Sequence, residues 1–223
     1  MTPVPRCPTF PAMPNVVEHT LQPSKIIGIG VNYRAHALEM GKGLPSEPLM
    51  FLKPPSSLIR DGEPISRPEG YERVDFEGEL GVVIKQRTYR ISREKALDAV
   101  LGYTCVNDVT VRDLQKKDGQ WARAKGFDSF CPVGPRIVAG LDPKHLRLIT
   151  RVNGNVRQDS STADMIHDVA AVISFCSQYM TLEAGDLITT GTPAGVGNLD
   201  PGDVVEIEIE GIGILSNPVI ARS

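Results

Sequence analysis

The sequence has no excess of positive charge, few aromatic residues and no long apolar run. Its 24 Lys and Arg residues are balanced by 27 Asp and Glu residues, and aromatic residues make up 5% of the chain. Nucleic-acid binding depends on a basic surface that neutralises phosphates, so this composition gives such a partner no electrostatic support. No segment approaches the ~18 apolar residues of a membrane span, and the start of the chain lacks the apolar core of a signal peptide. We expect a cytoplasmic protein with no nucleic-acid or membrane partner.

Several common motifs are also missing. The four cysteines are widely spaced and form no C-x-x-C pair, which argues against a zinc site or a disulfide framework. The stretch GIGVNY has Tyr33 where a dinucleotide-binding loop needs its third glycine, and GTPAGVG lacks the Lys-Ser/Thr pair of a P-loop. No G-x-S-x-G elbow is present, so an ordinary serine hydrolase is not indicated.

The pattern of apolar residues predicts a sheet-dominated α+β fold. With 223 residues, of which 41% are hydrophobic, the chain is long enough for one good-sized domain. Residues 1–20 are proline-rich and aperiodic, so we expect an N-terminal arm followed by a single domain over 21–223. Expected strands outnumber helices and do not alternate with them regularly, which disfavours a doubly wound parallel sheet.

Four segments are predicted to be helical. They are AHALEM, REKALDAV with Ser92 as its N-cap, VTVRDLQKK with Asp108 at its start, and ADMIHDVAAVISFCSQYM. The last is expected to be the longest, because its apolar residues recur at helical spacing. Expected strands lie in KIIGIGVNY, LMFLKPP, GYTCVND, DLITTGTP and, after a turn at DPGD, VVEIEIEGIGILSNPVIA.

Two expected strands place acidic residues together on one face. In DFEGELGVVI, residues 75–84, the acids Asp75, Glu77 and Glu79 alternate with apolar residues, and VVEIEIEGI does the same with Glu206, Glu208 and Glu210. Side chains two apart on a strand lie about 6.5–7 Å from each other, close enough for carboxylates to repel. Alternation alone favours a solvated acidic face for both strands, where screening makes the repulsion small.

Asp108 has two interpretations. An Asp at the start of a helix is a common N-cap. Alternatively, Asp108 turns inward and joins Glu77 and Glu79. Three carboxylates without Cys or His form a ligand set for a hard cation such as Mg²⁺ or Mn²⁺ and not for zinc. Such a cation would remove the repulsion between the acids.

His36 and Glu39 are spaced i and i+3, so a short helix would bring them together on one face. An imidazole oriented by a carboxylate is a plausible general base, although a surface His beside a surface Glu has the same spacing. Lys125, in ARAKGFD, is by default a solvated lysine.

Taken together, these segments resemble one family. NYRAHALEM, SEPLMFLKP, DFEGELGVVI, NDVTVRDLQ, AKGFDSFCPVGP, TADMIHD, LITTGTPAGVG and GDVVEIEIEGIG occur in the order found in the fumarylacetoacetate hydrolase family, from about Lys25 onward. The resemblance implies a mixed β-roll or β-sandwich with flanking helices, in a homodimer. It also implies a divalent metal, commonly Mg²⁺, held by Glu77, Glu79 and Asp108, and 2-oxo acid substrates.

The resemblance also suggests roles for further residues. Arg112, Gln115 and Thr192 match substrate-binding positions, and Lys125 matches a catalytic one. His36 with Glu39 resembles the dyad of the acylpyruvate-hydrolase branch. One departure is that fumarylacetoacetate hydrolase itself has an additional aspartate ligand with no counterpart at Val31 or Asn32. This favours a substrate other than fumarylacetoacetate.

These features predict a Mg²⁺-dependent enzyme that acts on the C–C bond beside a 2-oxo acid. Acylpyruvate hydrolysis to pyruvate and a carboxylate, or oxaloacetate decarboxylation, fits this site, with His36 activating a water for the hydrolysis. An alternative is an isomerase or decarboxylase of 2-hydroxydienoates in aromatic catabolism, since the C-terminal segment is similar to that branch. A non-catalytic protein that binds a 2-oxo acid is a third hypothesis.

Overall fold

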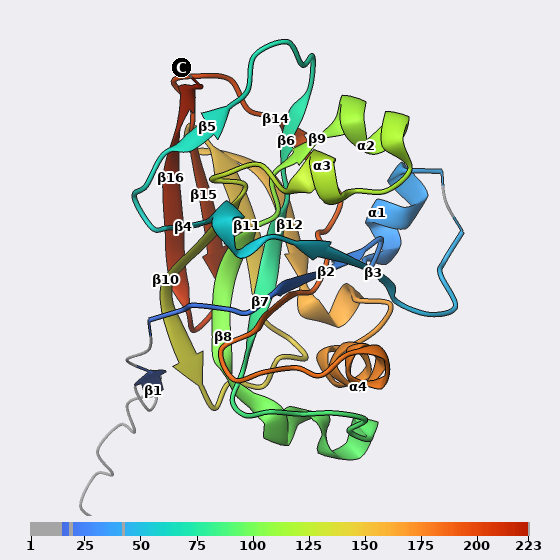
Figure 1. The fold of residues 1–223 in the computed structure, drawn as a ribbon. Coiled ribbons are helices and arrows are strands. Elements are labelled where there is room, and N and C mark those ends of the chain that lie inside the picture. The colour runs from blue at the N-terminus through green and yellow to red at the C-terminus, as the bar shows by residue number, and fades with distance from the viewer. Residues whose placement is uncertain (1–14, 18–19, 42, 223) are drawn as a thin grey trace, which may run out of the picture.

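The residues that the structure describes form three β-sheets, with the α-helices gathered on one side (Figure 1). The computed structural model describes residues 15–17, 20–41 and 43–222. The largest sheet has the strand order β1-β10-β8-β7-β13-β2-β3, with β4 pairing to β10. Its strands are β1 Asn15–Val17, β2 Ile26–Gly30, β3 Leu49–Lys53, β4 Leu58–Arg60, β7 Gly78–Ile84, β8 Val100–Asn107, β10 Cys131–Ala139 and β13 Leu187–Thr189.

Two smaller sheets complete the architecture. One has the order β12-β11-β15-β16-β5 and the other β14-β6-β9. Their strands are β5 Ile65–Arg67, β6 Val74–Phe76, β9 Thr110–Val111, β11 Arg147–Val152, β12 Asn155–Ser161, β14 Gly197–Asn198, β15 Val204–Ile209 and β16 Gly213–Ala221. Parallel pairs such as β13–β2 occur beside antiparallel ones such as β7–β8. The prediction of a sheet-dominated α+β fold is confirmed.

The helices are short. They are α1 Arg34–Glu39, α2 Arg112–Asp118, α3 Ala122–Lys125 and α4 Val169–Tyr179, with 3₁₀ turns at Pro55–Ser57, Arg93–Ala99 and Thr162–Asp164. In Figure 1, α1, α2 and α3 lie near one another and α4 lies apart from them. None of the helices in the described part of the chain has the length and apolar character needed to cross a membrane.

Three helix predictions are wrong in detail. In VTVRDLQKK, Thr110 and Val111 form β9, and α2 begins only at Arg112. The segment after Ser92 is a 3₁₀ turn, because the Lys95 N–H bonds the Ser92 carbonyl at 3.1 Å, and the Ser92 side chain makes no capping hydrogen bond. The long helix begins at Val169, where the Asp168 side chain accepts a hydrogen bond from Ala171 N at 2.8 Å. Ile166 lies outside the helix, since its N–H instead donates to the Asn32 carbonyl.

The expected aperiodic N-terminal arm contains a strand. Residues 15–17 form β1 and pair antiparallel with β10. The rest of the predicted arm, residues 1–14 and 18–19, lies outside the described residues. This pairing attaches the end of the arm to the largest sheet.

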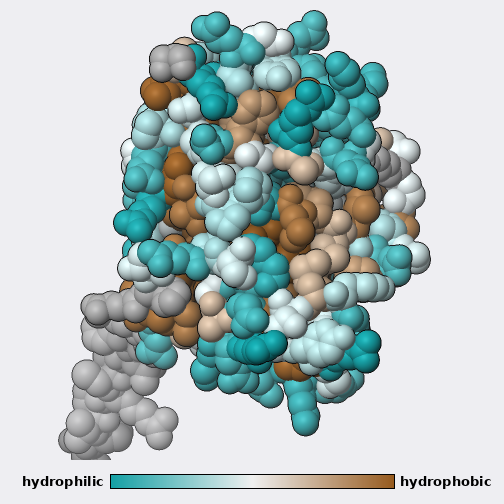
Figure 2. Space-filling model, in the orientation of Figure 1, coloured by the Kyte–Doolittle hydropathy of each residue, from teal (hydrophilic) through white to brown (hydrophobic). Residues whose placement is uncertain are grey.

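The core covers both faces of β7. Leu80, Val82 and Ile84 belong to the largest buried apolar cluster, whereas Val83 belongs to another and Phe76, just before the strand, to a third. Hydrophilic residues dominate the face of the molecule seen in Figure 2, with apolar patches between them. Because β7 is covered on both faces, its acidic residues cannot face bulk water.

Candidate metal centre and active site

Strand pairing brings the three predicted acids together. Glu77 lies between β6 and β7, Glu79 lies within β7, and Asp108 follows the last residue of β8. Gly78 pairs with Asn107 across the two strands, and Asp108 N donates to the Glu77 carbonyl at 2.9 Å. This register places the carboxylate that ends β8 beside the two at the start of β7.

The three carboxylates form a buried cluster. Glu77, Glu79 and Asp108 are 5%, 1% and 1% exposed, and each offers an oxygen within 4.8 Å of the others. Asp108 is not a helix cap, since α2 begins at Arg112 after Val111. The solvated-face interpretation of Glu77 and Glu79 is therefore wrong, and the inward interpretation of Asp108 describes the structure.

Lys125 lies against this cluster and is not a solvated lysine. It is 2% exposed, and its Nζ lies 2.8 Å from Glu77 Oε2, 2.5 Å from Asp108 Oδ2 and 2.9 Å from Thr110 Oγ1. The charges of Asp108 and Glu77 outweigh the effect of burial and raise the pKa of Lys125. A charged ammonium thus lies between two of the acids.

Arg112 connects the cluster to α2. Its Nε donates to Asp75 Oδ2 at 2.7 Å, its Nη2 lies 2.6 Å from Glu77 Oε1, and its Nη1 donates to Gln115 Oε1 at 2.8 Å. Because the Gln115 oxygen is engaged by a guanidinium, its amide nitrogen is the group left to donate.

Glu77 and Glu79 differ in how strongly positive charges of the protein favour their ionised forms. Burial opposes ionisation of Glu77, but the Lys125 and Arg112 charges outweigh it and hold the pKa of this carboxyl well below its usual range. Burial and the charges of Asp108 and Glu77 raise the pKa of Glu79 well above its usual value. Among the residues that the structure describes, Glu79 receives only a backbone hydrogen bond, from Gly191 N at 2.7 Å. Three buried oxygen donors with one poorly compensated acid fit a hard divalent cation.

The predicted His36–Glu39 pair is formed on α1. His36 Nδ1 lies 3.0 Å from Glu39 Oε2, and His36 is 4% exposed, so it is not a surface histidine. The carboxylate beside Nδ1 favours a proton on that nitrogen, which leaves Nε2 as the basic atom.

Thr192 contacts the backbone at the start of β7. Its Oγ1 donates to the Gly78 carbonyl at 2.9 Å and accepts from Gln158 Nε2 at 2.7 Å. Gln158 Oε1 in turn accepts from Gly78 N at 3.1 Å. The backbone between Glu77 and Glu79 is thereby fixed by side chains.

Most of the predicted site residues line one narrow cavity. It is lined by His36, Glu77, Glu79, Arg112, Gln115, Lys125 and Thr192, together with apolar residues. It adjoins a wider cleft of about 670 Å³ that shares Met40, Arg112, Gln115 and Trp121 with it and also contains Glu39. Asp108 is not among the residues that line either space, but Lys125, which lines the cavity, donates to its Oδ2.

The profile of the fumarylacetoacetate hydrolase C-terminal domain matches residues 25–220. The chain belongs to this family. A protein of Methanocaldococcus jannaschii is 53% identical over 199 residues, covering 89% of this chain and 84% of that protein. The oxaloacetate tautomerase of Bacillus subtilis is 46% identical over 89% of this chain and 70% of its own length. The crystal structure of 2-hydroxyhepta-2,4-diene-1,7-dioate isomerase from Mycobacterium marinum superimposes with a TM-score of 0.85 at 49% identity, covering 90% and 76% of the two chains.

Two buried charged residues of this family member, Lys53 and Asp75, were not predicted as part of the site. Lys53 is 1% exposed, and its Nζ donates to Asp108 Oδ1 at 2.5 Å and to the Phe130 carbonyl at 2.8 Å. Asp75 is fully buried and binds Arg73 as well as Arg112. The sequence contains a signal for each of them. Lys53 directly follows the apolar segment LMFL, and Asp75 is a third acid in register with Glu77 and Glu79.

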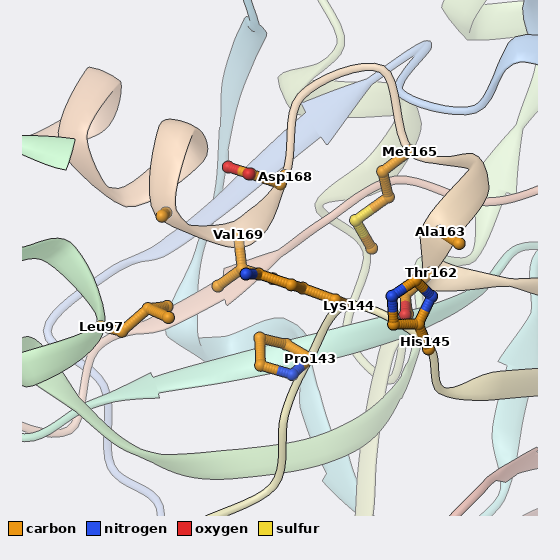
Figure 3. A pocket seen from close by; sticks show the side chains of 10 residues that line it. Leu97, Pro143, Lys144, His145, Thr162, Ala163, Met165, Asp168 and Val169 are labelled. Carbon is orange, nitrogen blue, oxygen red and sulfur yellow. The ribbon is translucent and has the colours of Figure 1, made fainter. Parts of the chain in front are cut away.

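A second cavity lies away from the acidic cluster. It has a volume of about 220 Å³ and is lined by residues at the start of α4, with Lys144, His145 and Thr162 (Figure 3). Its one carboxylate, Asp168, caps α4 and pairs with Arg93. None of the predicted site residues lines it.

Proposed function

We propose that this protein is a divalent-metal-dependent enzyme that acts on 2-oxo acids at the carbon beside the keto group. The observation that carries the proposal is the buried convergence of Glu77, Glu79 and Asp108 beside Lys125, in a cavity that His36 also lines. Burying carboxylates this close together destabilises the folded protein unless a positively charged group offsets their repulsion. Family membership and the names of the relatives support the same class of chemistry.

Glu77, Glu79 and Asp108 would hold Mg²⁺ or Mn²⁺, which when bound supplies Lewis-acid polarisation of the C2 keto group. The chain provides the remaining electrostatics. Lys125 and the Gln115 amide line the cavity and would donate hydrogen bonds where negative charge develops on the substrate. One such preorganised donor is typically worth ~3 kcal/mol. Arg112 orients Gln115 and, with Thr192, forms the wall that positions the substrate.

His36 would perform the proton transfers, with Glu39 holding its tautomer. In acylpyruvate hydrolysis, His36 takes a proton from a water that attacks the C4 carbonyl. The C3–C4 bond then breaks, C4 leaves as a carboxylic acid, and C3 receives a proton to give pyruvate. In oxaloacetate decarboxylation the same bond breaks with loss of CO₂, and no water attack is needed.

The comparisons favour a second candidate within this class. Tautomerisation of oxaloacetate moves a proton between C3 and the C2 oxygen. Isomerisation of a 2-hydroxydienoate moves a proton from the C2 hydroxyl to C3 or, through the conjugated diene, to C5. Neither reaction breaks a C–C bond. The B. subtilis relative is named an oxaloacetate tautomerase and the M. marinum structure a hydroxydienoate isomerase. His36 would move that proton at the same site.

Parallel assays with acetylpyruvate, oxaloacetate and a 2-hydroxydienoate test these reactions. We expect turnover with Mg²⁺ or Mn²⁺, loss in EDTA and recovery when the cation is restored, with metal-only blanks to subtract non-enzymatic reaction. The variant His36→Ala should lose hydrolysis and retain some decarboxylation. Full activity in EDTA contradicts the proposal, and tight 2-oxo acid binding without turnover favours a binding protein.

A further inference from the structure

Each acid of the cluster has one oxygen already held by a protein donor. Asp108 Oδ1 accepts from Lys53 Nζ at 2.5 Å, and Glu79 Oε2 accepts from Gly191 N at 2.7 Å. Glu77 Oε1 lies 2.6 Å from Arg112 Nη2. These three donors come from β3, from the loop after β13 and from α2, and each acid meets a different one.

The second oxygens of the three acids differ in their partners. Glu77 Oε2 and Asp108 Oδ2 are both bonded by Lys125, whose side chain lines the cavity. Glu79 Oε1 receives no hydrogen bond from any residue that the structure describes. A cation that binds the three acids would therefore take these second oxygens, in place of the Lys125 ammonium at Glu77 and Asp108. Lys53, Arg112 and Gly191 N occupy the other oxygen of each acid.

This arrangement matters for the choice of cation. Ca²⁺ takes six to eight oxygen ligands and often binds both oxygens of a carboxylate, whereas Mg²⁺ requires a near-ideal octahedron and keeps several waters. Three carboxylates that each offer a single oxygen leave three of six octahedral positions for water or substrate. They leave a Ca²⁺ ion short of protein ligands.

Lys53 is the donor best suited to a test, because it lies outside the cavity. It is 1% exposed and lines neither the cavity nor the adjoining cleft, so it reaches no substrate. Arg112, in contrast, lines both spaces. The Phe130 carbonyl holds the Lys53 ammonium in place as a second acceptor.

We propose that Lys53 is a positioning residue that makes this site selective for Mg²⁺ or Mn²⁺ over Ca²⁺, by occupying Asp108 Oδ1 so that Asp108 binds the cation through Oδ2 alone. The inference rests on the proposed function in that the three acids must hold a divalent cation. Lys53→Met removes the ammonium and keeps an unbranched apolar side chain in the buried space.

The experiment measures Mg²⁺, Mn²⁺ and Ca²⁺ affinities by titration calorimetry on the purified full chain and its variants. The matched control is Lys25→Met, which removes a lysine that pairs with another buried carboxylate, Asp186. Asp186 precedes β13, at the opposite end of this strand from Gly191. Thermal melts report the stability lost in each variant.

In Lys53→Met we expect Mg²⁺ and Mn²⁺ affinity to fall about tenfold or more, as when an outer-shell partner of a metal ligand is removed. Ca²⁺ affinity should fall less or rise, so the preference over Ca²⁺ shrinks by about tenfold. Lys25→Met should lose stability and keep the wild-type preference. An unchanged preference in Lys53→Met, whether or not all affinities fall together, overturns the inference.

Two further results separate the inference from the proposed function. Wild-type protein that binds none of the three cations refutes the proposed function itself. If Lys53→Met does not fold, a crystal structure of the wild-type protein with Mn²⁺ decides the matter. Asp108 binding through one oxygen with Lys53 on the other supports the inference, and Asp108 binding through both oxygens overturns it.

Discussion

Two strands of this protein alternate acidic and apolar residues, yet they use their acids in opposite ways. In β15, Glu206 and Glu208 are half-buried and Glu210 after it is exposed, while Val205, Ile207 and Ile209 are buried. At the start of β7, Glu77 and Glu79 are buried together with the apolar residues. Alternation shows which residues share a face, but it does not show what covers that face.

The partners of each carboxylate explain the difference. Glu208 pairs with Arg151 at 2.7 Å at the partly exposed face of its sheet, where water completes the solvation of both groups. Asp186 differs from Glu208, because its side chain is inaccessible to solvent. It accepts from Ser24 N and Oγ, Lys25 N and Nζ, and Glu183 N. Glu79 is as buried as Asp186, but within the described part of the chain it has a single hydrogen-bond donor, the backbone N–H of Gly191. The buried Asp186 is surrounded by donors, whereas Glu79 has few and could take a cation as its partner.

The largest effect is expected from Glu79→Gln, which keeps the shape of the side chain and removes its charge. Cation affinity should fall by at least ~100-fold, and turnover should fall with it. This is the upper end of the loss that follows removal of a group that only contacts a metal ligand, and Glu79 is itself expected to be a ligand. Calorimetry with Mn²⁺ and the oxaloacetate assay measure the two losses. The control, Glu208→Gln, should change neither.

The same variant should behave differently without metal. The folded-state pKa of Glu79 is raised above its unfolded value, so the metal-free protein binds more protons folded than unfolded. Its stability therefore declines as pH rises above about 4, the ordinary range of a glutamate carboxyl. Glu79→Gln removes this loss, so metal-free Glu79→Gln should melt higher than the metal-free wild type at neutral pH. A lower melting temperature would contradict the assignment of Glu79 as an uncompensated acid.

Sequence patterns were sufficient for the fold class and for local pairs. His36 and Glu39 are three residues apart on one short helix, so their contact follows from helix geometry alone. The register that joins Gly78 to Asn107 is a long-range property, and it is this register that places Asp108 beside Glu77. The residues alone left the convergence of the three acids as one of two interpretations of Asp108, and the family resemblance favoured it before the structure did.

The residues that sequence reasoning missed are those whose partners are distant in the chain. Lys53 meets Asp108 across 55 positions, and no spacing rule connects a strand-ending lysine with an acid so far away. Asp75 was seen as an acid in register with Glu77, but its role depends on Arg112, 37 positions on. Likewise, the early start predicted for α4 failed because Ile166 bonds the distant Asn32.

Asp186→Asn should have the largest effect on stability alone. The amide cannot accept all the hydrogen bonds of the carboxylate and leaves Lys25 without its anionic partner, so we expect a loss of ~3 kcal/mol. Lys25 and the surrounding donors outweigh burial and lower the pKa of Asp186, so its stabilisation is present above the unfolded value and is lost as pH falls through the folded one. Urea unfolding at neutral and acid pH should show a difference between wild type and variant that shrinks at low pH. Cation affinity should be unchanged.

A smaller effect is expected from Gly78→Ala, between the two buried glutamates. A Cβ at Gly78 would lie 2.1 Å from Thr150 Oγ1 on β11 and 3.0 Å from Gln158 Oε1 on β12. Overpacking of this kind costs ~1–3 kcal/mol. Gly43→Ala is the control, because nothing lies within 4 Å of a Cβ there. Equal melting temperatures for the two variants would show that β11 can move away from β7 without cost.

The smallest effect is expected from Glu208→Ala, and it completes the comparison between the two strands. The Glu208 side chain is 39% exposed and its partner Arg151 is 24% exposed, so their ion pair is screened by water and salt. Loss of such a pair changes the free energy of unfolding by ~0.5 kcal/mol or less. Urea denaturation at low and high salt checks this value, and the difference should vanish at high salt. A loss of several kcal/mol, independent of salt, would mean that Glu208 is buried against a partner as Glu77 is, and the contrast between β15 and β7 would no longer hold.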